Sequence, residues 1–137
     1  MKPSLFYKIA SVLLVLFAVG HTLGFRQIDP SWKVDSLAAS MQTIHFKAQG
    51  FSRTYWDFYV GFGLFVSVLL FLAALIAWQL GSIQAEILAR LTILNWGLAL
   101  CFVAITVLSW RYFFWAPVIF SSMITLCLIL GAWFSKE

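Results

Sequence analysis

The chain has 137 residues, of which 63% are hydrophobic and only 10% are charged, and its mean hydropathy is +0.95. Soluble domains carry about 25% charged residues, so this composition excludes an ordinary water-soluble protein and indicates an integral membrane protein. The formal net charge of +4 comes from scattered residues and not from a basic patch, which argues against a nucleic-acid partner.

Four apolar segments are each long enough to cross a bilayer, which takes about 20 helical residues. They cover about residues 5–25, 54–80, 87–110 and 112–134. Backbone polar groups inside lipid must be satisfied within the segment, so each one is predicted to be a helix. Only the first connection is long. The sequence therefore predicts an all-α membrane protein, with one transmembrane domain folded as a four-helix up-down bundle.

The first segment ends in the stretch AVGHTLGF, residues Ala18–Phe25. Its lysine-bearing start and its small residues would also suit a signal peptide with a cleavage site after Gly20. We expect the segment instead to be retained as the first membrane span. Gly20 and Gly24 then lie on one helix face and predict close packing against a neighbouring helix. His21 borders that face and is expected to point toward protein.

The long connector, residues 26–53, contains a second pattern. It begins with a turn signal at Asp29-Pro30-Ser31. Apolar residues then recur every three or four positions at Val34, Leu37, Met41, Ile44 and Ala48. This spacing predicts a short amphipathic helix over about residues 34–49, with Gly50 as its C-cap. The helix is expected to lie on the membrane surface or over the mouth of the bundle.

Two ionisable residues near the ends of the first two spans predict the site. His21 lies about one turn before the end of the first span, and Asp57 lies about one turn after the start of the second. Because ionisable groups in a span usually face a partner or a cavity, we expect these two side chains to face one another. Arg53 precedes Asp57 by one turn, and Gly61 opens space one turn below it. The walls and cover of this site are expected from Trp56, Tyr112, Trp115 and His45.

The same residues also fit purely structural roles. Asp57 could pair with Arg53 or with His21 and so fix the helix register. The aromatic residues could form the interfacial belt that membrane proteins commonly carry. His21 and His45 with a carboxylate could ligate a metal, but they lie on different elements and their convergence cannot be read from spacing. We therefore predict no metal site, and the sequence indicates no particular cofactor.

The two cysteines, Cys101 and Cys127, fit neither a disulfide framework nor a metal-ligand spacing, and we expect them to be buried free thiols. Standard catalytic motifs are absent from the sequence.

An even number of spans places both termini on one side of the membrane. Basic residues divide almost evenly between the two sides. We expect the termini to be cytoplasmic, because short lysine-bearing N-terminal segments usually stay inside.

Three classes of function remain. The first is a non-enzymatic protein that binds a lipid-like or quinone-like apolar molecule, or a membrane partner, at the His/Asp/aromatic mouth. The second is a membrane enzyme that uses His21 or Asp57 as a general acid or base on a lipid-like substrate. The third is a proton or ion carrier, which the lack of charges between the two interfaces disfavours. We rank them in this order. Membrane lipid is the expected partner, with homo- or hetero-oligomers in the membrane also open.

Two motifs carry a resemblance to a known family. They are GHTLGF, residues Gly20–Phe25, and SRTYWDFYVGFG, residues Ser52–Gly63. The chain resembles a small family of uncharacterised bacterial membrane proteins, in which the first motif closes the first helix and the second opens the next. More distantly, it is similar to DoxX-like four-helix membrane proteins, some of which associate with quinone-linked oxidoreductases. The resemblance implies a location in the bacterial inner (plasma) membrane and assigns no activity.

Overall fold

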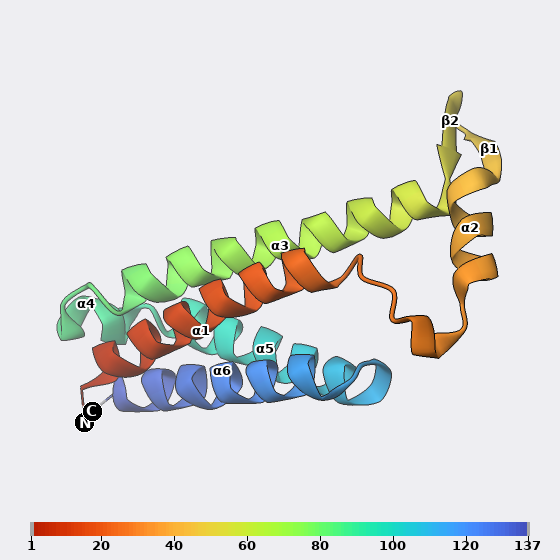
Figure 1. The fold of residues 1–137 in the computed structure, drawn as a ribbon. Helices are drawn as coiled ribbons and strands as arrows, with labels where there is room; N and C mark the ends of the chain where they lie inside the picture. Colours follow the sequence, from red (N-terminus) through yellow and green to blue (C-terminus); the bar gives the residue numbers. More distant parts are fainter. Residues whose placement is uncertain (1, 137) are drawn as a thin grey trace. The chain divides into compact units, whose positions relative to one another are not determined.

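The computed structural model describes residues 2–136. Four long helices dominate it: α1 (Pro3–Gly24), α3 (Tyr55–Leu80), α5 (Thr92–Tyr112) and α6 (Trp115–Phe134) (Figure 1). Each has at least 20 residues and a strongly apolar stretch, so it is long and apolar enough to cross a membrane. At 1.5 Å per residue, even 20 residues span about 30 Å, the thickness of the hydrocarbon core. These four helices indicate a multi-pass membrane protein.

The third span begins later than predicted, at Thr92 instead of residue 87. A separate helix, α4 (Ala85–Arg90), precedes α5, and the chain bends at Leu91 between them. The fourth span begins at Trp115 and not at residue 112, because Phe113 and Phe114 are extended. The predicted spans, residues 87–110 and 112–134, run across the bend at Leu91 and across the extended residues Phe113 and Phe114, because apolar composition alone does not mark a break in a helix.

The predicted connector helix over residues 34–49 is wrong in its second half. Helix α2 covers only Asp35–Thr43, and strands β1 (His45–Ala48) and β2 (Phe51–Thr54) follow it as an antiparallel hairpin. Gln49 and Gly50 both have positive φ, 50° and 89°, which is the backbone of a two-residue hairpin turn. Gly50 therefore forms a hairpin turn instead of a C-cap. The turn signal at Asp29 is confirmed, because that residue caps the 3-10 helix η1 (Pro30–Trp32).

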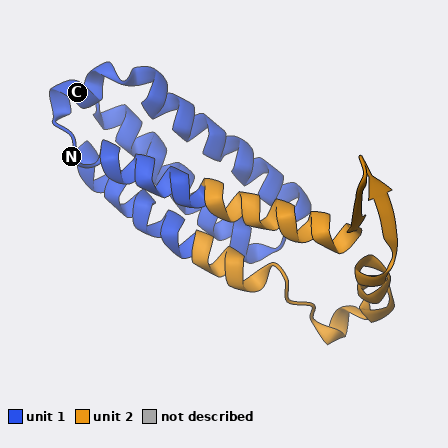
Figure 2. Ribbon diagram, turned by 90° about the horizontal axis from the view of Figure 1, so that it is seen from above, with its two compact units in different colours: residues 1–17, 70–137 blue, residues 18–69 orange. Residues whose placement is uncertain are grey.

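The chain divides into two compact units, shown in Figure 2, and helices α1 and α3 each contribute to both. Unit 1 comprises residues 1–17 and 70–137. Small residues of α3 let its neighbours approach: Ala74 and Ala77 are fully buried, and the Ser11 hydroxyl of α1 donates a hydrogen bond to the Ala74 carbonyl over 2.8 Å. Helices α5 and α6 are joined by a hydrogen bond between the Thr106 and Thr125 hydroxyls, 2.9 Å apart. These are typical contacts between membrane helices.

Unit 2 comprises residues 18–69 and holds the end of α1, the connector with its hairpin, and the first half of α3. The packing face predicted at Gly20 and Gly24 is wrong. Both glycines are exposed, and a Cβ added at either would meet no atom within 4 Å. Close approach occurs instead at Gly63 of α3, where an added Cβ would overlap the ring of Phe25. The close approach is therefore made by the side chain that follows α1 and by a small residue of α3.

Candidate functional site

A hydrogen-bonded polar seam joins α1 to α3 in unit 2. The Nδ1 atom of His21 lies 3.1 Å from the Ser67 hydroxyl, and the Thr22 hydroxyl lies 2.8 Å from the same oxygen. Two backbone carbonyls complete the network. The Ala18 carbonyl oxygen lies 2.7 Å from the Thr22 hydroxyl, and the Gly63 carbonyl oxygen lies 3.2 Å from the Ser67 hydroxyl. His21 is half-buried. The sequence placed His21 at a helix seam correctly but did not identify its partner.

The protons of this network can be arranged in two consistent ways. In the first, the Ser67 hydroxyl donates to Nδ1 of His21, so the imidazole proton sits on Nε2 and that atom is a donor. In the second, His21 donates from Nδ1 to Ser67, Ser67 donates to the Gly63 carbonyl, and Nε2 is an acceptor. The tautomer of His21, with the matching orientation of the Ser67 hydroxyl, therefore determines whether Nε2 is a donor or an acceptor.

Aromatic side chains continue from His21 toward the connector. The imidazole stacks on Phe25 with ring centroids 5.1 Å apart, and Phe25 lies 5.9 Å from Tyr59. Tyr59 in turn lies 5.3 Å from Trp56. The Tyr59 hydroxyl donates a hydrogen bond to the carbonyl of Phe25, which ties α3 to the end of α1. These contacts hold the imidazole at one end of a row of rings.

Asp57 has a different role from the predicted one. Its carboxylate accepts a hydrogen bond from the Thr54 backbone N–H at 2.8 Å, and its own N–H donates to the Thr54 hydroxyl at 3.1 Å. This reciprocal pair is a capping box, which satisfies two of the free N–H groups at the start of a helix. The predicted contact with His21 is wrong. His21 contacts Ser67 instead, which lies ten residues further along α3 than Asp57, about 15 Å at 1.5 Å per residue.

The other predicted site residues of unit 2 are not gathered around His21. Arg53 donates to the Ser52 carbonyl at 2.8 Å and lies over the ring of Phe51. His45 is on the hairpin, exposed, with its Nδ1 atom 3.5 Å from the Ser52 hydroxyl. Gly61 faces open space, since an added Cβ would meet nothing within 4 Å, and its part in a site stays a prediction.

Two predicted wall residues lie in unit 1. Tyr112 ends α5 and Trp115 begins α6, and their side chains are 72% exposed in each case. Trp115 packs edge-on against Trp110 at 6.5 Å. Their part in a site formed by unit 2 stays a prediction. The thiols are free, and Cys101 is exposed while Cys127 is partly buried, so the expectation of two buried thiols is wrong for Cys101.

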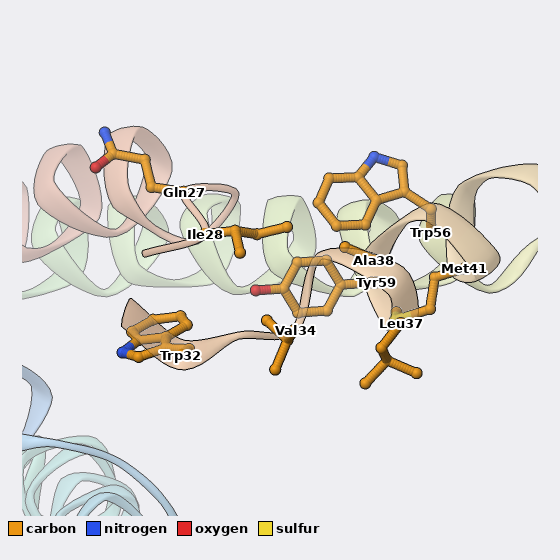
Figure 3. A pocket seen from close by; sticks show the side chains of 9 residues that line it. All are labelled: Gln27, Ile28, Trp32, Val34, Leu37, Ala38, Met41, Trp56 and Tyr59. Atoms are coloured by element: carbon orange, nitrogen blue, oxygen red, sulfur yellow. The ribbon is translucent and has the colours of Figure 1, made fainter. Parts of the chain in front are cut away.

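An apolar cavity of about 130 Å³ lies beneath the connector in unit 2 (Figure 3). Trp56 and Tyr59 of α3 line one side, and Leu37 and Met41 of α2 line another. The remaining lining residues come from the chain between α1 and α2 and from α2 itself: Gln27, Ile28, Trp32, Val34 and Ala38. Figure 3 shows the rings of Tyr59, Trp32 and Trp56 arranged around this space. Tyr59 thus borders both the cavity and the row of rings that ends at His21.

Trp56, which was expected to wall a site at His21 and Asp57, lines this cavity, and the other lining residues were not predicted for this site. One pattern along α3 could have indicated it. Tyr59, Gly63 and Ser67 are spaced four apart and so share one helix face, and all three contact residues 21–25, at and just after the end of α1. A glycine between an aromatic residue and a serine on one face indicates close packing of another element.

No protein-family model matches the chain, and comparisons with curated proteins and with solved structures likewise return no match. Between residues 2 and 136, no three His, Cys, Asp or Glu side chains gather into a set that could hold a metal ion. The function must therefore be argued from the geometry of unit 2.

Proposed function

We propose that the protein is a multi-pass membrane protein that binds part of a lipid-like or quinone-like molecule in unit 2. We further propose that the four spans form an up-down bundle in a bacterial inner membrane with both termini cytoplasmic. The even number of spans and the motif resemblance support this topology. The connector, with α2 and the hairpin, would then lie at the opposite membrane surface.

The apolar cavity carries the proposal. Engineered apolar cavities of about 150 Å³ bind benzene, whereas drug-sized ligands need roughly 300–1,000 Å³. A space of about 130 Å³ therefore suits one ring or a short stretch of acyl chain. Three aromatic residues line it: Trp32, Trp56 and Tyr59. Among the other lining residues, Gln27 supplies a polar group, its side-chain amide. Apolar walls with a few polar groups are typical of small-molecule sites.

The polar seam supplies the second part of the site. Tyr59 lines the cavity and contacts Phe25, on which His21 stacks. Because Ser67 occupies Nδ1, the remaining ring atom Nε2 can meet a polar group of the ligand. A quinone carbonyl or a lipid ester would accept from it in the first proton arrangement, and a lipid hydroxyl would donate to it in the second.

Filling the cavity tests this function. Ala38 is almost fully buried and lines the cavity, whereas Ala39 is exposed on the same helix. We expect Ala38→Leu to weaken binding of a short-chain benzoquinone or of a short-chain lipid at least tenfold, measured by quenching of tryptophan fluorescence in detergent. Ala39→Leu adds the same atoms outside the cavity and should leave binding unchanged. Equal binding by both variants would contradict the proposal.

The acid–base alternative receives no support from the geometry. An enzyme that used His21 and Asp57 together would need both groups within hydrogen-bond reach of one substrate. About 15 Å of α3 separates their positions, and the Asp57 carboxylate is engaged in the capping box.

A further inference from the structure

A row of large aromatic side chains runs from the hairpin down one face of α3. Successive rings lie 4.9 Å apart between Phe46 and Tyr55, 5.8 Å between Phe46 and Phe58, and 6.5 Å between Phe58 and Phe62. The last step, from Phe62 to Phe65, is 6.4 Å. We call this row, with the neighbouring hairpin ring, the aromatic column; it comprises Phe46, Phe51, Tyr55, Phe58, Phe62 and Phe65.

The column occupies a different helix face from the cavity. Positions 55, 58, 62 and 65 recur every three or four residues and so share one face of α3, while Tyr59, Gly63 and Ser67 share the face that meets α1. The column is open to its surroundings, with Phe62 64% and Phe65 67% exposed. Phe25, the residue that follows α1, contacts Gly63. The part of α3 between its start at Tyr55 and Gly63 therefore lies beyond the end of α1.

An interfacial aromatic belt does not explain this arrangement. Belt residues gather at the level of the lipid head groups. The column instead extends from Tyr55 to Phe65, ten residues or about 15 Å along the helix. That length matches one leaflet of a hydrocarbon core about 30 Å thick.

A cation stands at the hairpin end of the column. Arg53 pairs with Phe46 across the hairpin and therefore shares its face, and the guanidinium lies 5.3 Å from the ring centroid of Phe51. Its one hydrogen bond within the described chain goes to the Ser52 carbonyl, which leaves most of its five donors open. The nearest acid in sequence, Asp57, is engaged in the capping box.

The order of chemistry along the column matches that of a phospholipid. Arg53 offers a guanidinium that suits a phosphate, Tyr55 is amphipathic, and the rings beyond it are wholly apolar. The whole connector, residues 26–53, also carries four basic side chains against two acidic ones. A second copy related by an axis along the membrane normal would bring two Arg53 guanidinium groups to the same level, where like charges repel.

We propose that the aromatic column and Arg53 form a binding site for an anionic phospholipid. The phosphate lies against the Arg53 guanidinium, and one acyl chain lies along Phe58, Phe62 and Phe65. This site is separate from the cavity beneath the connector and does not depend on it.

Native mass spectrometry of the protein released from nanodiscs tests this assignment, with equal amounts of phosphatidylglycerol and phosphatidylcholine as the probes. We expect the unaltered protein to retain phosphatidylglycerol several-fold over phosphatidylcholine. Arg53→Gln should abolish that preference. Lys47→Gln is the matched control, because it removes one positive charge from the opposite face of the same hairpin, where Lys47 pairs with Ser52. It should keep the preference.

A second pair of variants tests the apolar part of the site. Phe62→Ala should lower the retention of both lipids at least threefold, whereas Phe71→Ala, at an exposed phenylalanine of α3 outside the column, should not. Ala38→Leu should leave lipid retention unchanged, which separates this site from the cavity. Equal lipid preference in the Arg53 and Lys47 variants would overturn the proposal. The proposal would also be overturned if the unaltered protein has the mass of a dimer and Phe62→Ala has the mass of a monomer, since a second chain would then cover the column.

Discussion

Replacing Gly63 by alanine tests the contact that joins α1 to α3 in unit 2. An added Cβ would lie 2.8 Å from Cζ of Phe25 and closer still to two other ring atoms. The ring cannot turn away freely, because it stacks on His21 and contacts Tyr59. Overpacking of this kind costs about 1–3 kcal/mol. Removing a helical glycine recovers about 0.5–1 kcal/mol, so the net loss in the free energy of unfolding is about 0–2.5 kcal/mol.

Gly61 provides the matched control on the same helix, because an added Cβ there meets no atom within 4 Å. The gain from replacing glycine is common to both variants and cancels in their difference. Gly63→Ala should therefore unfold about 1–3 kcal/mol more easily than Gly61→Ala. The measurement is equilibrium unfolding in mixed dodecylmaltoside and dodecylsulfate micelles, followed by tryptophan fluorescence. Equal stability of the two variants would refute the packing of Phe25 on Gly63.

Three further contacts give smaller effects. Thr54→Ala removes half of the capping box with Asp57 and should destabilise the start of α3 by about 1 kcal/mol, seen as faster hydrogen exchange in its first turn. Thr106→Val breaks the hydrogen bond to Thr125 and should cost about 0.6 kcal/mol in the same unfolding assay. Hydrogen bonds from the side chain of Ser31 and from its backbone N–H lower the pKa of the Asp29 carboxyl. Stabilisation of η1 is therefore complete above the ordinary aspartate pKa and is lost as pH falls through the lowered one, whereas Asp29→Asn should show no such titration by NMR.

The spans were predictable because bilayer thickness alone fixes the length of an apolar run. The predicted ends differ from the helix ends by a few residues, except at the third span, where α4 precedes the bend at Leu91. Apolar spacing predicted the connector helix as far as Thr43. It failed beyond that point because the alternation of the hairpin also places apolar residues at Ile44 and Ala48, and because glycine suits both a helix cap and a hairpin turn.

The candidate site was predictable in part. His21 was expected to face protein, and it does so through Ser67. The pairing with Asp57 failed because depth was counted from helix ends, as if α1 and α3 ended at the same level. The contact between His21 and Ser67 shows instead that α3 starts twelve residues, about 18 Å, beyond the level of His21. The greater length of α3, 26 residues against 22 in α1, accounts for about 6 Å of this offset.

The partners of His21 favour a binding role over proton transport. A carrier needs a second group that takes up the proton, and the other side chains of the seam, Thr22 and Ser67, are hydroxyls that do not titrate in the physiological range. What the hydroxyls can do is rotate. When the imidazole proton moves between Nε2 and Nδ1, the Ser67 hydroxyl rotates to match, and Nε2 changes from donor to acceptor without any change in charge. A neutral polar contact of this kind, which suits a carbonyl or a hydroxyl, supports the proposed recognition of a lipid-like molecule in unit 2, where Tyr59 lines the cavity and contacts the Phe25 ring on which His21 stacks.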